Sequence, residues 1–229
     1  MTQPDGAEKF FGRRKGRTLR ARQKRLMDEL LPTMTVDLSG ETVDAGSLFD
    51  GKAREVWLEV GFGAGEHLVW QAQNNPDVGI IGCEPYINGV ARLLGKVEDE
   101  GITNARIIAD DARLLMDKLP DQSLDRVFVL FPDPWPKTRH AFRRFIGPAN
   151  LERLARLLRD GAILRVASDH KPYVRWTMLH AADHPDFEWL DEGPCDWHVR
   201  PDDWPATRYE QKALAGRPHY LQFRRKTRV

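Results

Sequence analysis

Three glycines at alternate positions, flanked by acids, form the first pattern able to do chemistry. Gly61, Gly63 and Gly65 end an apolar run that contains Glu59, and Glu84 follows nineteen residues after the last glycine. Glycine permits a tight turn and a close approach of the backbone to a ligand. An acid at the position of Glu84 can accept hydrogen bonds from both hydroxyls of a ribose. The pattern indicates a pocket for a ligand that contains a nucleoside.

Two ligands suit a glycine loop with a ribose acid: a dinucleotide and S-adenosylmethionine. A dinucleotide loop has the spacing G-x-G-x-x-G, because the pyrophosphate must sit on a helix N-terminus. This loop is G-x-G-x-G, and Glu66 follows where a pyrophosphate would meet a negative charge. Glu59 suits a cationic amino-acid head, and Asp111, after a later strand, suits an adenine. These acids favour S-adenosylmethionine.

A segment stiffened by prolines offers a second constellation. Pro132, Pro134 and Pro136 exclude a helix and hold Asp133 and Trp135 between them. Asp133 supplies an acceptor, and stacking of a base on an aromatic face such as that of Trp135 is worth about 1–3 kcal/mol. For Trp135 alone, a side chain that covers the core is the favoured interpretation, but the whole cluster indicates function. Cations suited to phosphate follow at Lys137, Arg139, Arg143 and Arg144.

The composition bounds the class of protein. A hydrophobic content of 41% in 229 residues is enough for one packed α/β domain. No run approaches the ~20 apolar residues of a membrane span, and no secretory signal is expected. Two cysteines exclude a disulfide-dense scaffold and a four-cysteine zinc site. His180 and His184 lack an evident third ligand, so no metal is expected. The expected location is the cytoplasm.

The net charge of +1 hides a segregated pattern. Residues 1–30 carry nine Lys and Arg against four acids, residues 137–165 carry eight against two, and residues 217–229 carry five against none. Such a chain can present a basic face to a polyanion. The alternative is three separate solvated surfaces.

The elements that must position these residues alternate along the chain. A parallel sheet with right-handed crossovers is expected, and ligands bind at the carboxyl ends of such strands. Strands are expected at 55–60, 78–83, 105–109, 126–131, 162–167, 187–190 and 220–224. Helices are expected at 20–31, 66–74, 86–100, 150–158 and 173–182, the first ended by Pro32 and the fourth by Gly161. Residues 1–32 are expected to form a basic arm, flexible without RNA, and residues 33–229 a single domain.

The sequence resembles the bacterial tRNA (guanine-N7-)-methyltransferases over almost its full length. The motifs that carry the resemblance are 13–17, 58–65, 82–86, 111–112, 131–137 with 139–140 and 143–144, 167–169, and 207–210. The resemblance implies a Rossmann-like class I methyltransferase with a mostly parallel seven-stranded sheet and helices on both faces. It implies S-adenosylmethionine as the donor and the guanine at position 46 of the tRNA variable loop as the acceptor. Pro136, Ser168 and Arg208 depart from the residues common at their positions.

The resemblance also implies roles for residues, with Asp133 as the catalytic one. The donor is expected to contact Glu59, Gly61, Gly63, Gly65, Glu84, Asp111 and Asp133. The substrate is expected to contact Lys137, Asp169, Thr207, Arg208, Tyr209 and Glu210. Weaker RNA contacts are expected from Arg13, Arg14, Arg17, Arg139, Arg143 and Arg144. For Asp169, capping of the following helix is an equal alternative.

The N7 atom of guanine is an unprotonated lone pair, so no base is needed to expose it. We therefore expect Asp133 to orient the base and stabilise positive charge rather than to remove a proton. Two other functions stay open: a nicotinamide dehydrogenase, whose glycine spacing is absent, and a non-catalytic RNA-binding module. A monomer without an obligate protein partner is expected, with a homodimer as the alternative.

Overall fold

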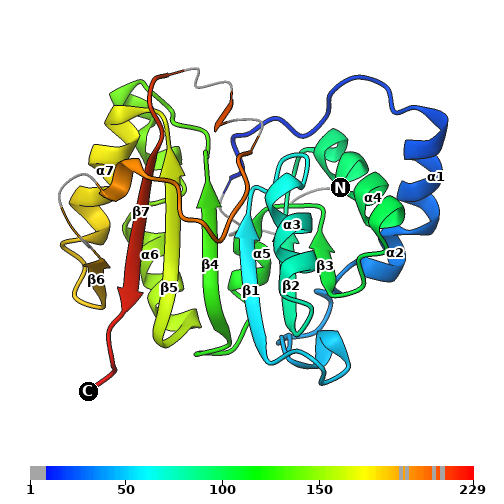
Figure 1. The fold of residues 1–229 in the computed structure, drawn as a ribbon, viewed down its shortest axis with the longest axis horizontal. Helices are drawn as coiled ribbons and strands as arrows, with labels where there is room; N and C mark the ends of the chain where they lie inside the picture. Colours follow the sequence, from blue (N-terminus) through cyan, green and yellow to red (C-terminus); the bar gives the residue numbers. More distant parts are fainter. Residues whose placement is uncertain (1–8, 191–192, 194–195, 208–209, 212–214) are drawn as a thin grey trace.

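A seven-stranded sheet forms the centre of the protein (Figure 1). The computed structural model describes residues 9–190, 193, 196–207, 210–211 and 215–229. The strand order is β3-β2-β1-β4-β5-β7-β6; β1 to β5 pair in parallel and β7 runs antiparallel to β5 and β6. The strands are β1 (Glu55–Val60), β2 (Val78–Cys83), β3 (Ala105–Ile108), β4 (Leu124–Leu130), β5 (Leu158–Ser168), β6 (Phe187–Leu190) and β7 (His219–Arg225). This confirms the expected mostly parallel sheet.

Helices cover both faces, as expected. Figure 1 shows α3 in front of the sheet and α5 and α6 behind it. The helices are α1 (Ala21–Glu29), α2 (Leu31–Met34), α3 (Glu66–Asn74), α4 (Ile87–Glu100), α5 (Ala112–Met116), α6 (Pro148–Leu157) and α7 (Lys171–Ala181). Three short 3₁₀ helices are η1 (Ser47–Phe49), η2 (Thr138–Arg143) and η3 (Asp196–His198).

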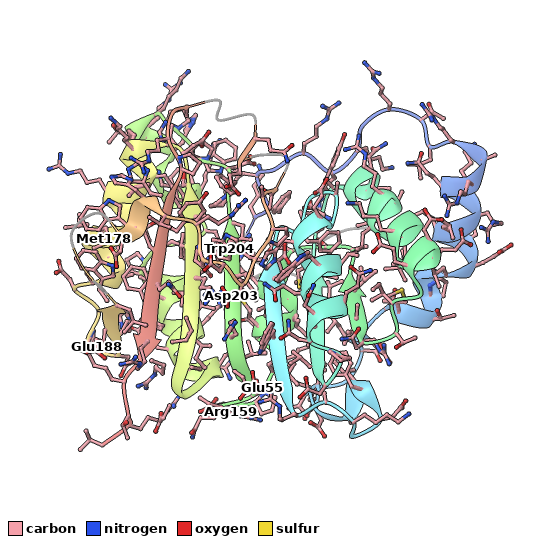
Figure 2. The ribbon with its side chains drawn as sticks, viewed as in Figure 1. Glu55, Arg159, Met178, Glu188, Asp203 and Trp204 are labelled. Carbon is pink, nitrogen blue, oxygen red and sulfur yellow. The ribbon has the colours of Figure 1, made fainter. Side chains whose placement is uncertain are left out.

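Two apolar clusters fill the spaces on either side of the sheet. Alternate residues of a strand point to opposite faces, so Leu58 joins the cluster under α5, α6 and α7 while Trp57 joins the cluster under α1, α3 and α4. On the face of the sheet that carries α1, α3 and α4, Trp204 covers the part over β4, β5 and β7. It is buried in the same cluster as Trp57. Figure 2 shows Asp203 and Trp204 in front of the middle of the sheet. An irregular segment, and not a helix, therefore covers this part of the sheet.

The ends of two helices, which were expected to be set by Pro32 and Gly161, differ from the expectations for reasons that the structure shows. The first helix ends at Glu29, and Pro32 lies in the first turn of α2, where a residue without a backbone N–H is tolerated. The helix α6 ends at Leu157, and Gly161 lies inside β5 with φ +83°. The β4–β5 register shifts beside it, so this glycine serves a bulge and not a helix end.

The basic N-terminal stretch packs against α4. Arg22 and Arg25 of α1 form ion pairs with Glu98, and Arg22 also pairs with Asp99. From α1 the preceding chain runs along the upper edge of the sheet in Figure 1, the edge at which the parallel strands end. Ile87 N donates a hydrogen bond of 3.0 Å to Arg14 O. These contacts bring residues 9–17 next to the strand ends.

Candidate active site

The carboxyl ends of β1, β2 and β4 and the loop after β3 surround one cavity of about 740 Å³. Ligand sites of about 300–1,000 Å³ are usual for small molecules. Gly61, Gly63, Glu84, Asp111 and Asp133 all line it, so residues that are far apart in sequence meet at the edge where the sheet topology places ligands.

The glycine loop takes a conformation that other residues rarely adopt. Gly61, Gly63 and Gly65 have φ of +75°, +58° and +76°. Helix α4 lies so close that a Cβ on Gly89 would come within 2.3 Å of Gly63 O. Glycine at both positions lets β1 turn tightly into α3 under the start of α4. Gly65 N-caps α3 and does not line the cavity.

Glu84 braces this loop from the end of β2. Its Oε2 accepts a hydrogen bond of 2.8 Å from Gly63 N, and its Oε1 accepts one of 2.9 Å from Tyr86 N. Burial raises the pKa of Glu84, and the nearby Asp133 and Glu59 carboxylates add to the rise, while the two N–H donors oppose it. Glu84 is thus a buried acid held in a fixed orientation.

Asp111 caps α5 and pairs with a cation that the sequence did not suggest. Its Oδ1 accepts from Arg113 N at 3.0 Å, and Arg113 Nη2 lies 2.6 Å from its Oδ2. Arg113 Nη2 also donates to Lys9 O at 3.3 Å. The sequence could have predicted this pair, because Asp111 and Arg113 are only two residues apart at the start of a short helix. The pair balances the charge at this end of the cavity and fixes the N-terminal segment beside it.

The loop that carries Asp133 is strained on both sides. Phe131 and Trp135 have φ of +50° and +42°, values that residues other than glycine adopt rarely and mostly at functional sites. Arg144 holds the loop by donating from Nε to Pro134 O at 3.0 Å and from Nη2 to Trp135 O at 3.2 Å. Arg144, predicted as an RNA contact, is thereby a brace for this loop. Trp135 lines the cavity outside both apolar clusters, so its interpretation as a core-covering side chain is wrong.

Asp133 has no hydrogen-bond donor among the residues that the structure describes. Water reaches it through the open cavity, yet the surrounding walls remove enough solvent to raise its pKa. An unpaired carboxylate of this kind is available to a ligand.

Glu59, predicted as a donor contact, lies behind the glycine loop and not on the cavity wall. It shares a face of β1 with Trp57 and therefore points toward α3. Its Oε2 lies 2.8 Å from His67 Nδ1, and its side chain is buried.

Aromatic rings and cations gather at the mouth of the cavity. The rings of Phe11 and Phe142 meet edge to face at 5.5 Å, and the Arg143 guanidinium lies 4.3 Å from the Phe11 ring and 4.9 Å from that of Trp135. Phe142 is nevertheless 68% exposed. The rings of Phe11 and Phe142 were not singled out from the sequence, because nothing in it brings residue 11 to residue 142.

The predicted RNA cations of the N-terminal stretch lie beside the same cavity. Arg13 lines it over the Tyr86 ring, Arg14 pairs with Asp110 at 2.7 Å, and the carbonyl of Arg17 accepts from Asn88 Nδ2 at 2.6 Å. Lys137 and Arg139 are exposed around η2.

Most arginines of the basic blocks 137–165 and 217–229 form ion pairs with acidic residues of the protein. The ion pairs are Arg153–Asp117, Arg156–Asp121, Arg159–Asp125, Arg225–Asp186 and Arg228–Asp160. By contrast, Lys15, Arg17, Lys137 and Arg139 have no acidic partner in the described part of the chain. These four cations follow or precede lining residues of the cavity in the chain, so they are available to a polyanion near its mouth.

The predicted substrate residues near the C-terminus form a separate group away from the cavity wall. Asp169 Oδ2 accepts from Ala215 N at 3.0 Å, and α7 begins after His170, so the helix-capping interpretation of Asp169 is wrong. Thr207 and Glu210 bond each other reciprocally, and Glu210 Oε1 accepts from Tyr220 OH at 2.6 Å. Arg208 and Tyr209 lie outside the described residues.

Comparison with known proteins assigns the family. Residues 53–221 match the family model described as "Putative methyltransferase". A tRNA (guanine-N(7)-)-methyltransferase of Rhodospirillum rubrum is 52% identical to this chain, over 99% of this chain and 91% of the relative. Another, of Ruegeria sp. (strain TM1040), is 56% identical over 94% of this chain and 87% of the relative. The chain belongs to the tRNA (guanine-N(7)-)-methyltransferase family.

Solved structures with the same fold agree with this family. The 16S rRNA methyltransferase KamB superposes with a TM-score of 0.59 and 18% identity, over 82% of this chain and 96% of that chain. A SAM-dependent O-methyltransferase from Thermotoga maritima gives 0.51 and 13%, over 92% and 73%. At such identities the likeness shows the fold alone, and it confirms the predicted Rossmann-like class I methyltransferase.

Burial raises the pKa of the Cys83 thiol, which suits a structural cysteine and not a nucleophile. No group of three His, Cys, Asp or Glu side chains in the described ranges is arranged to hold a metal ion. None of the described helices has the length and apolar character needed to cross a bilayer.

Proposed function

We propose that the protein transfers the methyl group of S-adenosylmethionine to N7 of the guanine at position 46 in the variable loop of tRNA. The products are 7-methylguanosine and S-adenosylhomocysteine. The observation that carries this proposal is the division of the cavity: the acids Glu84, Asp111 and Asp133 line its inner wall, and arginines and aromatic rings, with Phe142 exposed, line its mouth. Family membership supports the same reaction.

The inner wall suits the donor. Gly61 and Gly63 leave backbone space for it, Glu84 stands where the ribose hydroxyls would bind, and Asp111 with Arg113 stands at the adenine end. S-adenosylmethionine supplies a methyl group already activated on a sulfonium. The protein must therefore hold the acceptor in line with that methyl group, and well-oriented placement can contribute roughly 7–11 kcal/mol to lowering a barrier.

Asp133 is the group best placed to act on the acceptor. Methyl transfer moves positive charge from the donor to the purine, and a nearby carboxylate stabilises charge that develops there. Asp133 has no competing partner among the described residues, and the strained backbone around it fixes its direction. Its role is electrostatic and orienting, because N7 carries no proton to remove.

The mouth suits a folded RNA. Cations at Lys15, Arg17, Lys137 and Arg139 would neutralise phosphates, and the rings of Phe11 and Phe142 would stack on bases. Asp169, Thr207 and Glu210 are proposed to contact the tRNA as well. Because Asp169 and Glu210 already accept hydrogen bonds from Ala215 N and Tyr220 OH, we expect tRNA binding to exchange those bonds.

Three transcripts of one tRNA test the acceptor atom and its position. They carry guanine, adenine or 7-deazaguanine at position 46; the last keeps the Watson–Crick edge but has carbon in place of N7. We expect methyl transfer to the guanine transcript only, and competitive inhibition by the 7-deazaguanine transcript. Transfer to the adenine transcript at the rate of the guanine transcript would overturn the proposed position.

The affinity for S-adenosylmethionine should fall in mildly acidic solution. Burial raises the pKa of Glu84 and of Asp133, so both acids become neutral at a higher pH than exposed carboxyls do. Attraction of a cationic donor is full above these raised pKa values and is lost as the pH drops through them. Calorimetry over about pH 5 to 8 checks this. S-adenosylhomocysteine, which lacks the sulfonium charge, should lose less affinity; equal losses for the two ligands would contradict the electrostatic account.

Replacing Phe142 by alanine should raise the KM for tRNA by about 5- to 150-fold, because stacking of one base contributes about 1–3 kcal/mol. The affinity for the donor should not change, since Phe142 lies at the mouth. Leu179→Ala, which removes a comparably exposed side chain from α7, is the control. Steady-state kinetics with unmodified tRNA give both values, and an unchanged KM would exclude stacking on Phe142.

We further propose that residues 1–32 form a basic arm on a single domain of residues 33–229. Because α1 of this arm already pairs with α4, we expect RNA to tighten this packing rather than to create it. A monomer that needs no obligate protein partner is proposed, with a homodimer as the alternative. The cytoplasm, where tRNA is available, is the proposed location.

A further inference from the structure

Two polar side chains without a role in the proposed function are buried beneath the glycine loop. His67 and Gln71 lie one turn apart on α3, and they are 2% and 1% exposed. They connect Glu59 to the chain that crosses the other half of the sheet. His67 Nδ1 lies 2.8 Å from Glu59 Oε2, His67 Nε2 lies 3.1 Å from Gln71 Nε2, and Gln71 Nε2 donates to Asp203 O at 2.8 Å.

The hydrogen bonds fix the protonation of the imidazole. Asn75 Nδ2 donates to Gln71 Oε1 at 3.0 Å, which orients the Gln71 amide with its NH₂ group toward His67 and Asp203. An amide NH₂ only donates, so His67 Nε2 must accept. The proton therefore sits on Nδ1 and is donated to Glu59. His67 is neutral, and both of its nitrogens are used.

One end of this chain of bonds is the donor loop. Glu59 lies two residues before Gly61, and no described residue donates a hydrogen bond to its other oxygen, Oε1. The charge of Glu59 also reaches the cavity, because it helps to raise the pKa of Glu84. His67 thus holds one oxygen of a carboxylate beside the donor loop and leaves the second free.

The other end is the segment that leads to Thr207. Asp203 accepts two hydrogen bonds from Arg165 Nη1, at 2.7 and 2.8 Å. The adjacent Trp204 packs against the rings of His67, at 5.7 Å, and Tyr220, at 5.5 Å. Tyr220 OH in turn donates to Glu210. Asp203 and Trp204 are the residues seen in front of the sheet in Figure 2.

A purely structural core would not need this arrangement. Each buried polar group costs free energy unless it is hydrogen-bonded, and a partly satisfied buried network is worse than apolar packing. Leucine and methionine at these two positions would fill similar space without that cost. The hydrogen bonds have a functional explanation if Glu59 and Asp203, at their two ends, must keep a fixed position relative to each other.

We infer that His67 is a positioning residue that holds Glu59 behind the donor loop, where its charge acts on the cationic donor, and that His67 and Gln71 together couple the donor loop to the segment 203–207. This inference rests on the proposed function, in which the loop binds S-adenosylmethionine and that segment meets tRNA. Donor and tRNA then bind cooperatively, each tightening the other. Binding couplings between two sites are typically 5- to 150-fold.

Two variants of His67 separate orientation of Glu59 from packing. His67→Asn places an amide nitrogen near the position of Nδ1 and keeps the donor to Glu59, whereas His67→Leu fills the space and leaves Glu59 unpaired. We expect His67→Leu to weaken S-adenosylmethionine binding by about 10- to 100-fold, the effect of losing a hydrogen bond to a charged group. His67→Asn should bind within about threefold of the wild type.

Gln71→Met tests the coupling separately, because it cuts the link to Asp203 and leaves the His67–Glu59 bond in place. Calorimetry measures the donor affinity with and without saturating tRNA that carries 7-deazaguanine at the target, so no transfer occurs. The wild type should show a coupling of at least about fivefold, and Gln71→Met should bring it close to one. His184→Asn, at a buried histidine that pairs with Glu152 at 3.4 Å on another face, should leave affinity and coupling unchanged.

The outcomes distinguish this inference from the proposed function. If the wild type does not methylate tRNA, the proposed function fails. If it does, but His67→Leu binds the donor as the wild type does, His67 does not position Glu59. If the wild-type coupling is absent or survives in Gln71→Met, the link to the segment 203–207 is wrong. Should His67→Leu not fold, the Gln71→Met result decides, because that variant keeps the buried hydrogen bond between His67 and Glu59.

Discussion

Asp133→Asn is expected to lower kcat for methyl transfer to tRNA by about 10²- to 10³-fold, the usual cost of removing one group that stabilises developing charge. The amide keeps the shape and polarity of the side chain but removes the negative charge beside the purine. The strained loop is held by Arg144 through carbonyl groups, so it should persist in the variant. The change in kcat should therefore exceed the change in donor affinity.

Single-turnover kinetics with saturating donor and tRNA measure this effect on the chemical step. Asp183→Asn removes an exposed carboxylate just after α7 and serves as the matched control, with a rate near that of the wild type. A near-wild-type rate for Asp133→Asn would show that the carboxylate has no electrostatic role. A loss confined to donor affinity would make Asp133 a binding residue only.

Glu84→Gln is expected to weaken S-adenosylmethionine binding by about 10- to 100-fold. The carboxylate accepts from Gly63 N and Tyr86 N at the same time, one with each oxygen. An amide has one oxygen, so one of these two N–H groups would face an NH₂ donor. The variant therefore disturbs the glycine loop and also loses an acceptor for the ribose.

The folding stability of Glu84→Gln should change much less than its donor affinity. Burial raises the folded-state pKa of Glu84 above its unfolded value, so the ionised carboxylate lowers the free energy of unfolding at neutral pH, and this cost disappears as the pH falls through the folded pKa. Removing the charge offsets part of the lost hydrogen bonding. Thermal unfolding and calorimetry on the same samples separate the two effects. Glu100→Gln, at the exposed end of α4, is the control, and equal donor affinities for Glu84→Gln and the wild type would contradict the ribose role.

The periodicity of apolar residues and the positions of glycine and proline were sufficient to predict most of the strands and helices. The run at 55–60 became β1 without change, because apolar residues, then glycine, leave few alternatives. Pro32 and Gly161 led to wrong helix ends for the same reason. Proline can follow a helix or begin one, and glycine can end a helix or form a bulge in a strand, and only the packing of the chain decides between these positions. The five-residue helix α5 was missed because it is shorter than two helical turns and shows no period.

The candidate site was predictable as far as strand ends determine it. Glu84, Asp111 and Asp133 follow three strands, and parallel pairing brings them to one cavity. Contacts from irregular segments were not predictable, because no period relates them. The link from α3 to Asp203 and the approach of residue 11 to Phe142 both depend on the path of a loop. The side to which Glu59 points follows from strand alternation and was available from the sequence.

The most direct test of the central claim is the fate of a tritiated methyl group. Purified protein is incubated with labelled S-adenosylmethionine and unmodified tRNA, the RNA is digested, and the nucleosides are separated by chromatography. We predict label in 7-methylguanosine, lost in Asp133→Ala. Label in another nucleoside, or in 7-methylguanosine at undiminished rate with Asp133→Ala, would contradict the proposed reaction or the assigned site.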